Sequence, residues 1–86
     1  MITKDVTIEI ASGTDARETA MLVQIASRYK SSLYLKSKEK TFNAKSIMGM
    51  MTLGLKSGDT LSVTADGEDE EEAINSITDF LIGKKS

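Results

Sequence analysis

Two short stretches hold the side chains that could do chemistry in this chain. The first reads Gly13-Thr14-Asp15-Ala16-Arg17-Glu18, and the second reads Asn43-Ala44-Lys45-Ser46-Ile47-Met48-Gly49-Met50-Met51. The carboxylate of Asp15 could accept a phosphoryl group as an acyl phosphate. Ser46 directly precedes an apolar run, where a serine either caps a helix or presents its hydroxyl for phosphorylation. The residues alone leave these alternatives open.

Histidine and cysteine are both absent from the chain. The usual zinc ligands, the commonest general base, thiolate metal sites and disulfides are therefore excluded. Carboxylates, lysines and hydroxyls remain for any chemistry. We therefore expect a protein that is not an enzyme and that needs neither a metal ion nor another cofactor.

The charge and length of the chain limit its partners. A formal net charge of −2 and a pI near 5.0 give no overall attraction to nucleic acid, so direct nucleic-acid binding is not expected. The chain starts without a basic and apolar leader, and no apolar run is long enough to cross a bilayer. We expect a cytoplasmic protein without a membrane partner. Its 86 residues, 40% of them hydrophobic, predict one small domain with a thin core.

Hydrophobic periodicity predicts the order strand, helix, strand, strand, helix, strand, helix. Strands are predicted over residues 2–10, 32–36, 41–43 and 60–65, where apolar and polar residues alternate. The polar run 37–40 predicts a loose hairpin turn, and residues 57–59 predict a second turn. This order predicts an α+β fold with helices on one face of a four-stranded, mostly antiparallel sheet. Periodicity leaves the strand order open.

The first predicted helix covers residue 16 to about residue 28. Its inward face is predicted to hold Ala16, Ala20, Val23 and Ala26, widened by Leu22, while Met21 and Ile25 lie off this face. A short second helix over residues 47–53 is weakened by Gly49.

The last predicted helix follows the acidic run 68–72. Its buried residues are predicted to be Ala73, Ile74, Ile77 and Leu81. Carboxylates stabilise a helix N-terminus, and Lys84 and Lys85 are placed to stabilise its C-terminus. We therefore expect these charges to be structural and not to form an acidic metal or partner site.

The two stretches together resemble the HPr family, the small phosphocarriers of the sugar phosphotransferase system. The first stretch usually reads Gly-x-His-Ala-Arg-Pro-Ala in that family; here Asp15 stands at the histidine place and Glu18 at the proline place, while Arg17 is retained. Residues 45–49 match the family's regulatory serine segment. The resemblance covers essentially the whole chain, 1–86, as one HPr-like domain. It implies an open-faced β-sandwich and supplies the strand order.

Asp15 has three alternative roles. As a structural residue, Asp15 or Thr14 caps the first helix, and Glu18 completes a capping box; this role is favoured. As a functional residue, Asp15 either accepts a phosphoryl group to become an acyl phosphate or imitates the permanently charged state of a phosphorylated carrier. Because Asp15 replaces the carrier histidine, we expect the chain not to relay phosphate from the family's phosphoenolpyruvate-dependent enzyme.

Taken by itself, Ser46 is predicted to be a helix N-cap. The resemblance favours a second role, phosphorylation by an HPr kinase/phosphorylase, because the segment around this serine is intact. We predict that Met50 and Leu53 point inward and that Met48 and Met51 point outward. The implied partner-binding residues beside the serine are Ile47, Met48 and Met51, continued by Arg17, Ala20 and Gln24.

The resemblance extends to a histidine-less branch of the family, the Crh proteins, which act only in regulation. It implies that the serine-phosphorylated chain binds a LacI-type catabolite control regulator and raises its affinity for operator DNA. The alternative is a modulator or decoy that binds phosphotransferase-system proteins. The chain is expected to be a monomer or a weak homodimer. The carboxylates of Asp15 and Glu18 beside Arg17 favour a distinct choice of partner.

Overall fold

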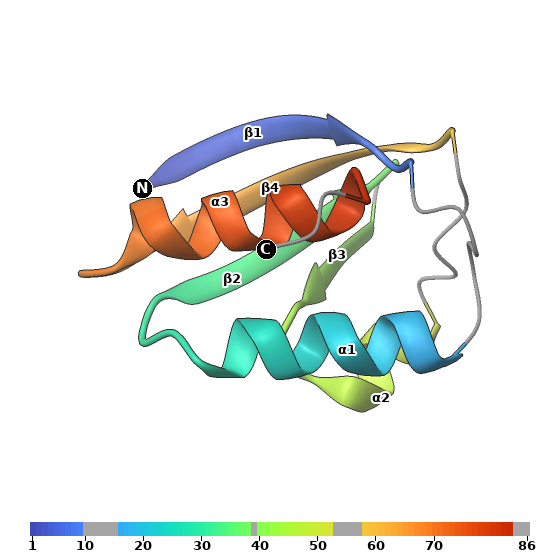
Figure 1. Cartoon of the computed structure of the whole chain (residues 1–86), viewed down its shortest axis with the longest axis horizontal. Coiled ribbons are helices and arrows are strands. Elements are labelled where there is room, and N and C mark those ends of the chain that lie inside the picture. Colours follow the sequence, from blue (N-terminus) through green and yellow to red (C-terminus); the bar gives the residue numbers. More distant parts are fainter. Residues whose placement is uncertain (10–15, 39, 53–57, 84–86) are drawn as a thin grey trace.

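The computed structural model of the chain describes residues 1–9, 16–38, 40–52 and 58–83 (Figure 1). Within these ranges the elements are β1 (Ile2–Thr7), α1 (Ala16–Ser27), β2 (Ser32–Ser37), β3 (Lys40–Asn43), α2 (Ile47–Met51), β4 (Thr60–Asp66) and α3 (Glu70–Leu81). The predicted order of elements is confirmed. The first strand is shorter than the predicted 2–10, since β1 ends at Thr7, and Ile10 lies outside the described residues.

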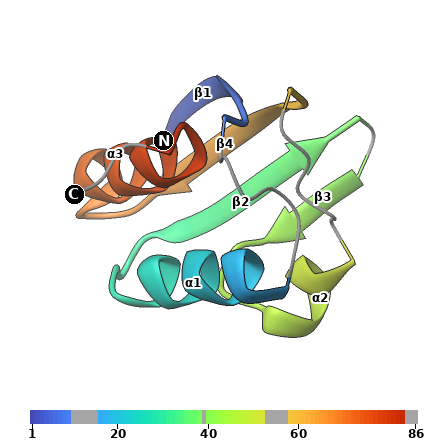
Figure 2. The same ribbon diagram turned by 45° about the vertical axis from the view of Figure 1, so that its right-hand side comes forward.

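The strands of the described ranges form one sheet in the order β1-β4-β2-β3. Every neighbouring pair is antiparallel. In this sheet β4 pairs with both β1 and β2, and β2 pairs with both β4 and β3, so β4 and β2 occupy the interior and β1 and β3 form the edges. The helices cover one face of this sheet. Over that face, α3 lies against β1 and β4, and α1 and α2 lie side by side toward the β3 edge (Figure 2).

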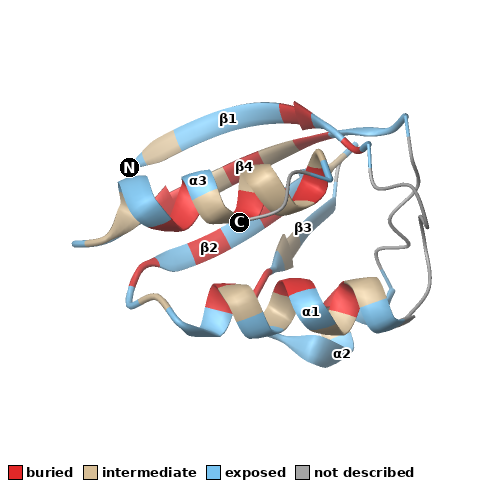
Figure 3. Ribbon diagram, in the orientation of Figure 1, coloured by how far each residue is buried: buried red, intermediate tan, exposed pale blue. Residues whose placement is uncertain are grey.

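The core lies between the sheet and the helices. Along β4, buried Leu61, Val63 and Ala65 alternate with less buried neighbours, as the period of two predicts (Figure 3). All of the residues predicted to be buried in α3 are buried: Ala73, Ile74, Ile77 and Leu81.

The inward face of α1 differs from the predicted one. Leu22 and Ala26 are fully buried and Thr19 is nearly so, whereas Ala20 and Val23 are half-buried. The helix is rotated toward Leu22 because burying a leucine removes more apolar surface from water than burying an alanine. Ile25 also packs against the core, and the side chain of Ala16 is outside the described ones.

A long-range contact connects the end of α1 to the start of α3. The carboxylate of Asp69 accepts hydrogen bonds from the backbone N–H of Lys30 at 2.9 Å and from the backbone N–H and hydroxyl of Ser31 at 2.9 and 2.5 Å. These donors, the Ser31 hydroxyl first, lower the pKa of Asp69 to about 2. Asp69 immediately precedes α3, but its side chain does not cap that helix. One member of the acidic run therefore stabilises a turn far away in sequence.

The rest of the acidic run fits its predicted structural role. Glu70, Glu71 and Glu72 lie in the first turn of α3, where negative charge is favourable. Lys84 and Lys85 lie outside the described residues.

Candidate functional site

Ser46 is the N-cap of α2. Its backbone is extended, at φ −101° and ψ 107°, and its Oγ accepts a hydrogen bond from the backbone N–H of Gly49 at 3.3 Å. Its carbonyl accepts from the backbone N–H of Met50 at 2.9 Å. The predicted cap is confirmed. The side chain is exposed, so the hydroxyl that starts the helix is also open to a modifying enzyme.

The residues before Ser46 hold it in place through a dense set of hydrogen bonds. The buried Ala44 donates its N–H to the carbonyl of Leu33 at 2.8 Å, which fixes the segment to β2. Asn43 accepts from Lys45 N–H at its Oδ1, 2.9 Å away, and from Ser46 N–H at its carbonyl, 3.0 Å away. Each backbone N–H from residue 44 to residue 46 therefore has a partner, and the path into α2 is fixed.

The ammonium group of Lys45 is directed at the C-terminal end of α1. Its Nζ donates to the carbonyl of Tyr29 at 2.6 Å, just beyond the last residue of α1. A cation at this end of a helix is favourable. Lys45 thus links the Ser46 segment to α1 and positions the two helices relative to each other.

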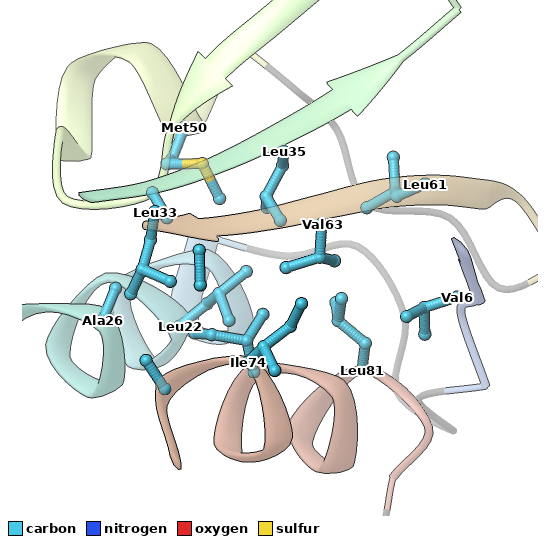
Figure 4. Close-up of a cluster of buried hydrophobic side chains, with 14 of the residues drawn as sticks. Val6, Leu22, Ala26, Leu33, Leu35, Met50, Leu61, Val63, Ile74 and Leu81 are labelled. Carbon is cyan, nitrogen blue, oxygen red and sulfur yellow. The ribbon is translucent and has the colours of Figure 1, made fainter. Parts of the chain in front are cut away.

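The exposed side of α2 is apolar. Met48 is 81% exposed, Met51 50% and Ile47 44%, whereas Met50 on the opposite side is fully buried. Figure 4 shows Met50 directed into the core cluster with Leu33 and Leu22. The predicted division of the methionines is confirmed, and Leu53 lies outside the described residues. We call Ile47, Met48 and Met51 the α2 patch.

Helix α1 lies beside α2 and supplies the neighbouring surface (Figure 2). Arg17 and Gln24 are exposed and Ala20 is half-buried. Met21, 44% exposed, falls between Arg17 and Gln24 on the same stripe of the helix. Sequence reasoning placed Met21 off the buried face without adding it to the site, although its spacing of four from Arg17 and three from Gln24 was the available signal.

The degenerate carrier site is only partly described. Asp15 and Thr14 lie outside the described residues, so the predicted helix cap by either residue stays a prediction. Arg17 is exposed and Glu18 is partly exposed in the first turn of α1. A carboxylate such as that of Glu18 is favourable in this turn.

Charge is divided between the two sides of the sheet. Residues 16–52 contain seven lysines and arginines and two acidic residues, whereas residues 58–83 contain eight acidic residues and no basic one. The strand order separates these segments, since β2 and β3 lie on one side and β4 with α3 on the other. Ser46 thus belongs to the basic half of the described chain, where positive charge favours a phosphate.

Metal clusters and membrane-spanning helices are both absent from the described ranges. In the ranges the structure describes, no group of three or more carboxylates is arranged to hold a metal ion. No helix in those ranges has the length and apolar character needed to span a membrane. The arrangement around Ser46 is the candidate site, because an exposed hydroxyl there begins α2 beside exposed apolar side chains. It can present a hydroxyl, and a phosphate on it, at the start of a helix whose first N–H groups are available to an anion.

Comparison with known proteins finds relatives over nearly the whole chain. The family model of the PTS HPr component phosphorylation site matches residues 2–82. The chain is 38% identical over 81 residues to the HPr-like protein Crh of Halalkalibacterium halodurans, which covers 94% of this chain and 96% of that protein.

Solved structures show the same likeness. The phosphocarrier protein HPr of Bacillus anthracis has a TM-score of 0.88 at 35% identity, covering 93% of this chain and 95% of the other. The catabolite repression protein Crh of Bacillus subtilis has a TM-score of 0.78 at 35% identity, covering 100% of this chain and 99% of the other, and its crystal structure is an intertwined dimer with domain swapping.

Proposed function

The chain belongs to the HPr family and is of its Crh-like type, and we propose that it is a non-catalytic regulatory protein that signals through phosphorylation of Ser46. The observation that carries this proposal is the exposed Ser46 hydroxyl at the start of α2, directly beside the exposed α2 patch, in a chain without histidine. An HPr kinase/phosphorylase would add and remove the phosphate. The protein would act as one domain in the cytoplasm.

The absence of histidine supports signalling over phosphate transfer. No phosphohistidine can form, and Asp15 puts a negative charge at the histidine place. A carboxylate repels an incoming phosphate dianion. A phosphate on Ser46 meets the opposite situation, because the start of α2 favours negative charge. Ser46 phosphorylation would therefore label the surface without unfolding α2.

The partner we propose is a LacI-type catabolite control regulator. Its basic residues would bind the phosphate on Ser46, and an apolar pocket would receive Met48, the most exposed member of the α2 patch. On α1, the contact would extend to Arg17, Ala20 and Gln24. The regulator, and not this chain, would contact DNA, in keeping with a net charge of −2.

A second candidate function uses the same surface. The chain would bind phosphotransferase-system proteins as a modulator or decoy, with Asp15 supplying the charge of a phosphorylated carrier. This is favoured by Arg17, which is retained two residues after Asp15. An acyl-phosphate carrier at Asp15 is the least supported alternative. For its own assembly we propose a monomer or weak homodimer, the latter by analogy with the dimeric Bacillus subtilis Crh.

Treatment with a purified HPr kinase/phosphorylase and ATP tests the proposal. We expect the intact mass to rise by one phosphate, about 80 Da, and the phosphorylated chain to bind the regulator more tightly than the unmodified chain. Ser46→Ala should take up no phosphate. Thr52→Ala is the matched control, because its hydroxyl lies at the other end of α2 and donates to the Gly49 carbonyl; this variant should be phosphorylated normally. An unmodified parent would overturn the proposal.

The carrier alternative has a separate test. Incubation with the phosphoenolpyruvate-dependent enzyme and phosphoenolpyruvate should leave the mass of this chain unchanged, while the Bacillus anthracis phosphocarrier protein HPr serves as the positive control. A labile adduct that is lost in Asp15→Asn would instead establish the acyl-phosphate carrier. Tight binding to that enzyme without an adduct would favour the modulator.

A further inference from the structure

We propose that Met48, Met51 and Met21 form a peroxide-sensitive modification site, and that their conversion to methionine sulfoxide weakens the binding of the α2 patch to its partner. The part of this inference that concerns the partner rests on the proposed function. The modification itself does not, because it follows from exposure and composition.

Exposure separates these methionines from Met50. The side chains of Met48, Met51 and Met21 are 81%, 50% and 44% exposed, while that of Met50, on the same short helix, is fully buried. Thioether oxidation follows access of the oxidant to the sulfur. The reactive order should therefore be Met48 and the 78% exposed Met1 first, then Met51 and Met21, with Met50 last.

The composition directs peroxide to these sulfur atoms. The chain contains five methionines and no cysteine, tryptophan or histidine, so no thiol competes for the oxidant. In the reaction the thioether sulfur attacks one oxygen of hydrogen peroxide and the O–O bond breaks. The sulfur is oxidised by two electrons and gains the S=O bond, and the other peroxide oxygen, reduced, leaves as water with both protons. No further reductant or metal is needed.

The exposed positions of these methionines determine how oxidation affects the fold and partner binding. Their exposed side chains contribute little to the core, so a sulfoxide leaves the fold in place, whereas the same change at Met50 would put a polar group into the cluster around Leu33. At an apolar contact the S=O group loses its water without gaining a hydrogen-bond donor in return. We expect partner affinity to fall about tenfold for oxidation at Met48.

Peptide mapping after treatment with increasing concentrations of hydrogen peroxide tests the modification. We expect a mass increase of about 16 Da per sulfoxide, first at Met48 and at the terminal Met1, then at Met51 and Met21. The circular dichroism spectrum should be unchanged and Met50 unmodified. Oxidation of Met50 before Met48, or resistance of Met48, would overturn the proposal.

Binding to the purified catabolite control regulator tests the consequence. The Ser46-phosphorylated chain is measured before oxidation, after oxidation, and after treatment with methionine sulfoxide reductases, which should restore affinity. The matched control replaces Met21, Met48 and Met51 by Leu, which keeps the surface apolar and removes the sulfur. This variant should bind with equal affinity before and after oxidation, although it retains Met1, which is 78% exposed and precedes β1.

The two proposals fail in different ways. If the unoxidised, phosphorylated chain does not bind the regulator, the proposed function fails, and the peptide mapping alone decides whether the modification site exists. If that chain binds and the oxidised chain binds equally well, the proposed function stands and the proposed effect of oxidation on binding fails. If oxidation lowered the affinity of the triple Leu variant as much as that of the parent, the effect would belong to another residue, and the proposed role of these three methionines would be overturned.

Discussion

The backbone N–H of Gly49 donates to the Oγ of Ser46 at 3.3 Å, so the hydroxyl proposed to carry a phosphate is the same group that starts α2. This length is just beyond the usual N–H···O range, and the side chain is exposed. A phosphate would bring additional acceptor oxygens to the same N–H groups. Modification at Ser46 is therefore compatible with the cap.

The cap makes a prediction about stability. Ser46→Ala removes the acceptor for Gly49 and should lower the free energy of unfolding by about 0.5–1 kcal/mol. Ser46→Asp keeps an acceptor and places a negative charge at the helix N-terminus, so it should stay within about 0.5 kcal/mol of the parent. Urea denaturation followed by circular dichroism measures both. Equal losses in the two variants would show that the cap does not act through an acceptor oxygen.

Gly49 gives a second prediction, in which stability and modification change separately. A Cβ added at Gly49 would lie 3.4 Å from the Oγ and 3.7 Å from the Cβ of Ser46, which is ordinary contact. Because alanine favours a helix over glycine by about 0.5–1 kcal/mol, Gly49→Ala should be as stable as the parent or more so. Its methyl group stands beside the hydroxyl, so the initial rate of phosphorylation by the kinase should fall.

Gly67 supplies the contrast for Gly49. A Cβ at Gly67 would lie 2.6 Å from the backbone Cα of Ser31, a distance that requires the turn to move. Gly67→Ala should therefore lose about 2 kcal/mol or more and should still be phosphorylated while folded. If Gly49→Ala lost as much stability as Gly67→Ala, slower phosphorylation would no longer report access to Ser46.

The α2 patch gives a third prediction. Because Met48 is exposed, Met48→Asp should change the free energy of unfolding by less than about 0.5 kcal/mol and weaken binding of the phosphorylated chain to the regulator by at least about tenfold. Met50→Ala is the matched comparison on the same helix, and it should cost about 2–5 kcal/mol. Thermal melts and calorimetric titration measure the two effects. A large drop in melting temperature for Met48→Asp would give this side chain a role in packing.

Local pattern was sufficient for the elements with a strong period. The spacing of Ala73, Ile74, Ile77 and Leu81 defined the buried face of α3, and the methionines of α2 were divided correctly because a short helix on a core has one inward side. The strand order β1-β4-β2-β3 was supplied by the family resemblance. Pairing partners lie far apart in sequence, and periodicity within a strand holds no information about them.

Two features depended on contacts that no local pattern records. The apolar spacing of α1 did not decide between two overlapping stripes, and packing against the core buries the one that contains Leu22 and Ala26, with Thr19 beside it. The bonds between Asp69 and residues 30 and 31 connect positions 38 or more residues apart. Within the sequence Asp69 looks like any other carboxylate before a helix.

Asp69 gives a prediction about acid stability. Its pKa is lowered from an ordinary 3.8 to about 2 in the folded protein, because Ser31 and Lys30 donate to the charged carboxylate. A group with a lowered folded pKa stabilises fully above its unfolded pKa, and this contribution is lost as the pH falls through the folded pKa. The contribution should therefore be complete above about pH 5 and should disappear between about pH 4 and pH 2.

Asp69→Asn separates this contribution from other acid effects. The variant removes the charge and should be less stable than the parent at neutral pH, with the difference in unfolding free energy shrinking toward pH 2. Glu70, whose pKa is also lowered by a hydrogen bond from the Met1 ammonium group, remains in both proteins and cancels in the difference. Glu72→Gln makes the same change in net charge on an exposed residue in the first turn of α3, away from Ser31 and Lys30, and should lose less stability at neutral pH than Asp69→Asn. A difference between parent and Asp69→Asn that stayed constant down to pH 2 would mean that the Asp69 carboxylate does not owe its stabilising effect to its charge.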